Sequence, residues 1–134
     1  MKKYRADNAW SSPYAALEIS HENATDGTWF VQITTGAGTI RNLSVTLSAI
    51  PTGKWVHLGF TYNGVTLITY MNGVPMDSAT YTAALDIGAG ELEVGGGSGV
   101  SSVYGAICDA RIDNVVRAPS WWQAEYRRGA LMET

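Results

Sequence analysis

The stretch GKWVHLGFTYNGVTLITYMNGV, residues 53–74, decides the fold. It contains two runs rich in β-branched and aromatic residues, 55–62 and 65–71, and an Asn-Gly pair follows each run. Asn-Gly between two such runs predicts a tight hairpin, because a type I′ turn needs positive φ at both central residues. We therefore expect a meander of antiparallel strands, in which 55–62 is a central strand because apolar groups lie on both of its faces.

Shorter strand patterns flank this meander on both sides. The clearest is the alternation of Leu43, Val45 and Leu47 with polar neighbours, which is the period of a half-buried strand. Other stretches are short runs of residues typical of strands, bounded by turn residues. The further stretches for which we predict strands are 14–19, 29–34, 41–48, 91–94 and 104–112.

A single helix is predicted near the end of the sequence. Pro119 suits the first helical position, Trp122 and Tyr126 lie four residues apart on one face, and Gly129 can end the helix. Short strands at regular spacing with one terminal helix are typical of an all-β sandwich of two antiparallel sheets. No repeat, linker or boundary is visible, so we expect residues 1–134 to form one domain.

Composition and charge narrow the possible functions. The formal net charge of −3 leaves no electrostatic footprint for nucleic acid. No stretch approaches the ~20 apolar residues of a membrane-spanning helix. Lys2 and Lys3 are followed by polar residues, so no signal peptide is predicted in this chain. The lone cysteine, Cys108, excludes an internal disulfide, and we expect it to be a small buried side chain on a strand.

Three stretches resemble the laminin-G-like branch of the concanavalin A-like lectin/glucanase superfamily. Residues 53–64 are similar to the pattern G-K-W-x-H-v-a-x-T-Y-D-G, and residues 67–74 to L-x-l-Y-v-N-G-v. Residues 105–114, GAICDARIDN, are similar to G-x-I-D-E-v-R-I-y-N, and 121–126 to the helix W-x-x-A-E-Y. Order and spacing agree over a little more than half of the chain.

The resemblance implies a jelly-roll sandwich and an extracellular or cell-surface location. It also implies that His57 packs and forms hydrogen bonds on a buried central strand. Cys108 stands where the family usually has its first acidic residue. The chain also begins too late to supply the whole opening strand pair of the family. Because a missing outer strand leaves N–H and C=O groups unpaired, we predict a homodimer, or another partner, at an open sheet edge.

The function favoured by the sequence is a non-catalytic binding or adhesion module with a glycan or protein ligand. The alternative is a structural or assembly domain of a larger surface or phage protein, without a small-molecule ligand. An enzyme is not expected, because glycosidases of this fold carry facing carboxylates in a pattern like Glu-x-Asp-x-x-Glu, and no such run occurs. We expect Glu91 and Glu93 to lie on the solvent-facing side of a strand. We expect Asp109 and Asp113 to form ion pairs with nearby arginines. A degenerate glycoside hydrolase is a weaker third possibility.

Aromatic side chains supply the candidate ligand-binding residues, because sugars stack on exposed tryptophan and tyrosine rings. Trp29, Trp55 and Tyr70 are expected in the core or on a sheet face. One of the two tryptophans at 121 and 122 should dock the helix. The candidates in loop-like or irregular stretches are Trp10, Tyr14, Tyr81 and Tyr104.

A polar loop at residues 21–27 supplies the one candidate metal site. Glu22 and Asp26 lie close to His21, and carboxylates are the hard oxygen ligands that calcium prefers. The spacing matches no defined calcium loop, so a solvated loop without metal is the alternative. No other cofactor is indicated by the sequence.

Overall fold

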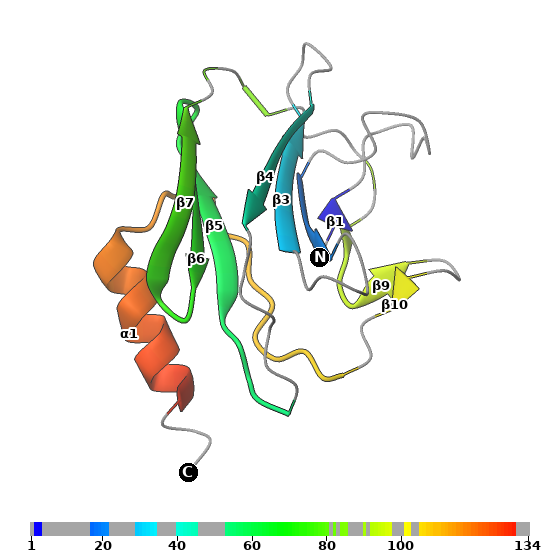
Figure 1. Cartoon of the computed structure of the whole chain (residues 1–134), viewed down its shortest axis with the longest axis vertical. Helices are drawn as coiled ribbons and strands as arrows, with labels where there is room; N and C mark the ends of the chain where they lie inside the picture. The colour runs from blue at the N-terminus through cyan, green and yellow to red at the C-terminus, as the bar shows by residue number, and fades with distance from the viewer. Residues whose placement is uncertain are drawn as a thin grey trace.

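The computed structural model describes residues 2–3, 17–21, 29–34, 40–45, 53–80, 82, 84–85, 90, 92–97, 101–102 and 105–130 (Figure 1). The strands are β1 (Lys2–Lys3), β2 (Leu17–His21), β3 (Trp29–Thr34), β4 (Ile40–Val45), β5 (Leu58–Tyr62), β6 (Thr66–Met71), β7 (Val74–Thr80), β8 (Leu92–Glu93), β9 (Gly96–Gly97) and β10 (Ser101–Ser102), and the helix is α1 (Pro119–Ala130).

The described strands form three antiparallel sheets. One has the order β4-β3-β2-β1-β8, the second is β5-β6-β7, and β9 pairs with β10. The helix α1 lies against one side of the β5-β6-β7 sheet, and β3 and β4 lie on its other side (Figure 1). The antiparallel strands and the terminal helix agree with the sequence-based expectation, whereas a closed two-sheet jelly roll stays a prediction.

The hydrophobic core lies between the two larger sheets. Val31 and Ile33 of β3 pack with Leu67 of β6, and Ile33 and Leu67 are almost fully buried. Val31 and Ile33 are two residues apart, so their side chains leave the strand on the same face. Burying each such side chain contributes about 1.5–3 kcal/mol. The core therefore joins the meander to the N-terminal strands.

The two Asn-Gly pairs form different turns. Asn72 and Gly73 have φ angles of 51° and 78°, as the predicted type I′ hairpin requires. In the first hairpin, however, the Asn63 N–H donates to the Thr66 carbonyl at 3.3 Å, so the central residues begin at Gly64, with φ of 90°. The prediction for this turn is wrong by one residue. The cause is the Asn63 side chain, whose Oδ1 accepts from the N–H groups of Val65 at 2.9 Å and Thr66 at 2.6 Å.

Most predicted strands are confirmed within a few residues, and the meander differs in two details. The predicted strand at 29–34 has the observed bounds of β3. The strand predicted at 55–62 begins only at Leu58, and Trp55 is about half exposed instead of buried. Within the described residues β6 is the central strand and β5 lies at the edge of its sheet, so the prediction of a central 55–62 strand is wrong.

The predicted strand at 104–112 is also wrong over the described residues 105–112, which have no strand structure. Asp109 has a φ of 53°, a left-handed conformation that interrupts the alternation of a strand. Cys108 is exposed and not a buried strand residue. The segment precedes α1, and charged side chains attach it to the helix.

The helix begins at Pro119, as predicted, and the Trp121 N–H donates to the Ala118 carbonyl at 2.9 Å in its first turn. Gly129 lies inside the helix and does not end it. Arg127 and Arg128 occupy the last turn, where positive charge interacts favourably with the helix dipole. Trp122 is the buried residue of the helix, which confirms that one of the two tryptophans docks it.

Candidate ligand-binding surface

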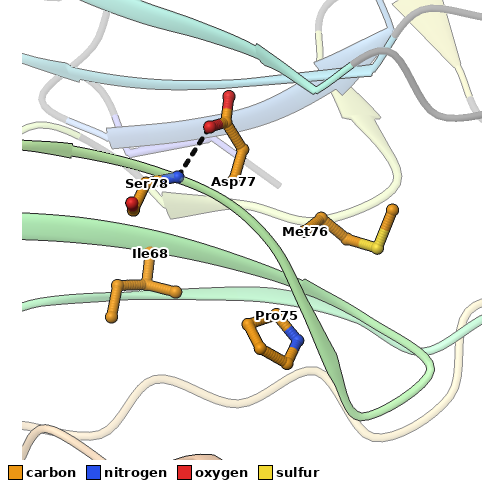
Figure 2. A pocket seen from close by; sticks show the side chains of 5 residues that line it. All are labelled: Ile68, Pro75, Met76, Asp77 and Ser78. Atoms are coloured by element: carbon orange, nitrogen blue, oxygen red, sulfur yellow. Dashed lines mark hydrogen bonds between the residues drawn. The ribbon is translucent and has the colours of Figure 1, made fainter.

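A shallow, open hollow lies beside a β-bulge in β7 (Figure 2). In the β6–β7 ladder Thr69 pairs with Asp77 and Tyr70 pairs with Pro75, so Met76 is an extra residue without a partner position. The bulge turns neighbouring side chains in different directions, with Ile68 and Pro75 on one side of the strand pair and Asp77 on the other (Figure 2). The hollow is lined by Ile68, Pro75, Met76, Asp77 and Ser78.

The hollow combines apolar carbon with polar groups. Ile68, Pro75 and Met76 supply the apolar surface, and Met76 is well exposed. The Ser78 N–H donates to Oδ1 of Asp77 at 2.7 Å, and the Thr69 hydroxyl donates to the Asp77 carbonyl at 3.3 Å. These two bonds fix the backbone of the bulge. The hollow is open, which suits a ligand that stays in contact with solvent.

Next to the hollow, α1 covers the same face of the sheet through Trp122. The indole stacks on the ring of Tyr70, with 4.7 Å between centroids and an angle of 11° between planes. Gly59 pairs with Tyr70 across the ladder, and any side-chain carbon at position 59 would collide with the indole. Gly73 is also close to the helix, since a Cβ there would lie 2.8 Å from Cα of Gln123. Two glycines therefore make room for the docked helix.

His57 completes this interface at the start of β5. Its N–H donates to Oδ1 of Asn72 at 3.0 Å, and its carbonyl accepts from the Asn72 N–H at 2.8 Å. The imidazole lies 5.5 Å from the Trp122 ring, tilted by 40°. The expectation of a buried central strand is wrong, because His57 precedes β5, which lies at the edge of its sheet among the described residues. Its backbone bonds to Asn72, and its ring packs against the helix.

Burial lowers the pKa of His57 below its usual 6.5. The nearby Glu125 and Asp109 carboxylates raise the pKa and offset part of this decrease, whereas Arg111 lowers the pKa further. Nδ1 of His57 is buried without a hydrogen-bond partner among the described residues, and so is Nε1 of Trp122. A buried polar atom without a partner is unfavourable by roughly 1–3 kcal/mol.

Ion pairs attach the 105–117 segment to the helix. Arg111 contacts Asp109 at 3.2 Å and Glu125 at 3.4 Å, and Arg128 contacts the same two carboxylates at 3.1 and 2.6 Å. Arg117 contacts Asp113 at 2.7 Å. The predicted pairing of Asp109 and Asp113 with nearby arginines is therefore confirmed, although the segment is not a strand.

Trp121 lies beside this network. The guanidinium groups of Arg111 and Arg117 lie 5.8 and 5.2 Å from its ring centroid, within the range of a cation–π contact. The ring also meets Trp122 edge to face at 5.1 Å. Trp121 consequently has a packing role, which makes it a poor platform for a sugar.

The candidate site residues from the sequence, Trp10, Tyr14, Tyr81 and Tyr104 for a ligand and Glu22 and Asp26 for calcium, lie outside the described residues. Among the described residues, no group of three or more His, Cys, Asp or Glu could hold a metal ion. In the same part of the chain no helix is long and apolar enough to cross a membrane.

Sequence reasoning missed the hollow at the bulge. Pro75 was the available signal, because proline lacks an N–H and occurs within sheets mainly at edges and bulges. The bulge itself depends on the pairing with β6, which no local pattern gives.

These features can now be compared with known proteins. The family model Laminin_G_3, of the concanavalin A-like lectin/glucanases superfamily, matches residues 3–121. The chain therefore belongs to this superfamily. Within it, the laminin-G-like resemblance seen in the sequence is confirmed, and the match extends well beyond the three motifs toward the N-terminus.

A solved structure supports the fold. The crystal structure of an S-layer domain-containing protein from Clostridium thermocellum has a TM-score of 0.52 and 20% sequence identity to this chain. The likeness covers 82% of this chain and 55% of that one, so this chain spans about half of the other protein's solved part. A search among curated proteins found no match. At this identity the likeness shows the fold alone.

Proposed function

We propose that the chain is a non-catalytic recognition module that binds a carbohydrate at the cell surface. The superfamily contains both lectins and glucanases, so membership leaves this choice open. The observation that carries the proposal is the hollow beside the bulge, where apolar side chains lie beside Ser78, while the Asp77 carboxylate lies on the other side of the strand pair. A pyranose offers the same combination, with C–H groups on one face and hydroxyls at its rim.

The carboxylates support binding over catalysis. Glycoside hydrolysis normally uses two carboxyl groups facing each other, about 5–9.5 Å apart, on either side of the scissile bond. Within the described part of the chain, Asp77 is the one acidic residue that lines the hollow. Asp109, Asp113 and Glu125 are held by arginines in the ion-pair network. An open hollow also admits water, which an active site usually excludes.

The test is a glycan array probed with the wild-type chain and three variants. Met76→Ala and Ser78→Ala alter the hollow, and Val65→Ala removes an exposed apolar side chain at a turn that does not line it. We expect the first two to weaken binding of any glycan at least tenfold, and Val65→Ala to leave it unchanged. Binding that survives both hollow variants would move the site elsewhere, first to Trp10, Tyr14, Tyr81 and Tyr104.

The second candidate is a structural or assembly domain of a larger surface or phage protein. Apolar side chains that are about half exposed in the segment before α1 favour it, namely Ile107, Ile112, Val115 and Val116. A second copy or another partner could cover them, whereas the homodimer predicted from the sequence uses an open sheet edge. Light scattering coupled to size-exclusion chromatography tests this: a dimer that binds no glycan supports assembly, and a monomer that binds one supports recognition.

A further inference from the structure

Among the described residues, α1 contacts the sheet through Trp122 and at the Gly73 turn. Trp122 is its buried residue, and the remaining contacts with the preceding segment are exposed ion pairs. Exposed ion pairs add little stability, with typical values near 0–1 kcal/mol. Among the described residues, the docking of the helix thus rests on the fit of the Trp122 indole against Gly59, Tyr70 and His57, and on the close approach of Gln123 to Gly73.

This interface contains an unfavourable feature. Nδ1 of His57 and Nε1 of Trp122 are both buried without hydrogen-bond partners in the described part of the chain. The two rings lie against each other, with centroids 5.5 Å apart. An imidazolium carries a proton on each nitrogen, so a protonated His57 would bury a charged N–H with no acceptor, and this is much less favourable than a buried neutral ring.

The charged groups that face His57 act in both directions. Glu125 on α1 and Asp109 on the preceding segment attract a proton to the imidazole, whereas Arg111 repels it. Both carboxylates are already shared with Arg111 and Arg128. Tyr70 on β6 faces this interface through its aromatic ring. Desolvation exceeds the effect of these charges, and the pKa of His57 is lowered.

We propose that α1 is a latch that protonation of His57 releases from the β5-β6-β7 sheet. Release would uncover Gly59 and the ring of Tyr70. Tyr70 and Ile68 are two residues apart on β6 and leave it on the same face, so the uncovered ring would extend the apolar surface of the hollow. Mild acid would thereby enlarge the candidate binding surface.

The sign of the pH dependence follows from the lowered pKa. Docking is fully favoured above the usual imidazole value of 6.5, and it weakens as the pH falls through the lower pKa of docked His57. Between these two values, uptake of one proton raises the equilibrium constant for release by about tenfold per pH unit.

Nuclear magnetic resonance of the full chain can follow the latch directly. The Gly59 Hα protons lie against the Trp122 indole, so their chemical shifts contain a ring-current contribution that disappears when the helix leaves. We expect this contribution to decrease between pH 7.5 and pH 5 in the wild type. In His57→Phe, which keeps an aromatic ring but cannot titrate, it should stay constant.

Two controls define the result. Trp122→Ala should lack the ring-current contribution at every pH, which identifies the signal. The methyl resonances of Ile33 and Leu67, in the core on the other side of the sheet, should stay unchanged over the titration. A Gly59 shift that is constant to pH 5, one that changes equally in His57→Phe, or one that changes together with the core methyls would each overturn the proposal.

Discussion

The two faces of the β5-β6-β7 sheet differ in what covers them and in what their side chains do. On the inner face Leu67 packs with Val31 and Ile33 of β3, and the contact is apolar throughout. On the outer face the Tyr70–Trp122 stack and the close approach of Gln123 to Gly73 hold the helix, and the hollow lies beside them. The inner face therefore stabilises the fold, and the outer face contains the surface that can change or bind.

The difference also shows in the polar groups. Thr69 on the inner face is buried, and its hydroxyl donates to the Asp77 carbonyl. The outer-face interface instead buries Nδ1 of His57 and Nε1 of Trp122 without partners among the described residues. Fully satisfied polar groups rigidify a structure, whereas unsatisfied ones mark a place where it is less stable. Substitutions on the two faces should reveal this contrast.

The largest effect is expected on the inner face. Leu67→Ala removes a side chain that is almost fully buried between the sheets, and we expect the free energy of unfolding to fall by about 2–5 kcal/mol. Urea denaturation followed by circular dichroism measures this change. A loss below about 1 kcal/mol would mean that Leu67 does not join the two sheets.

A smaller effect is expected where the helix meets the second hairpin. Gly73→Ala requires an unfavourable φ of 78° and places a Cβ 2.8 Å from Cα of Gln123, whereas Gly64→Ala has a similar φ of 90° with open space around it. We expect Gly73→Ala to cost about 1–3 kcal/mol more than Gly64→Ala, because only the former overpacks the helix contact. Equal losses of unfolding free energy would show that α1 is not packed on this turn.

The sequence predicted the inner face better than the outer one. The meander of residues 53–74, the β3 strand and the start of α1 follow from local patterns, because apolar alternation and Asn-Gly turns depend on neighbours along the chain. Residues 105–112 have the alternation of a strand, yet Asp109 adopts a left-handed conformation and its carboxylate contacts Arg111 and Arg128. The pairing with Arg111 is local and was predicted, whereas the contact with Arg128 of α1 and the left-handed conformation of Asp109 do not follow from the local pattern.

The candidate site was predicted less well for the same reason. The hollow depends on the register shift between Thr69 and Tyr70, which places Met76 outside the ladder. Only Pro75 gave a local hint of this bulge. The aromatic candidates Trp10, Tyr14, Tyr81 and Tyr104 stay predictions, to be tested by the glycan array.

The aromatic stack on the outer face should couple two residues by a modest amount. We expect Tyr70→Leu and Trp122→Leu to show a coupling free energy of about 0.5–1.5 kcal/mol, because stacked aromatic rings gain roughly this much beyond their buried area. A double-mutant cycle from urea denaturation measures the coupling. If the losses simply add, the rings do not contact each other in solution.

The smallest effect is expected at the Arg117–Asp113 pair, whose atoms lie 2.7 Å apart on the surface before α1. Asp113→Asn keeps the shape of the side chain and removes its charge, so we expect a loss of about 0.2–1 kcal/mol at low salt and almost none at 1 M salt, where the Debye length is about 3 Å. The same urea titration at two salt concentrations measures it. A loss above 2 kcal/mol that persists at 1 M salt would mean that Asp113 is part of a packed contact and not of an exposed ion pair. The outer side of the molecule would then be packed as tightly as the inner face. Weak attachment of α1, the main physical reason to expect its release in mild acid, would then be absent.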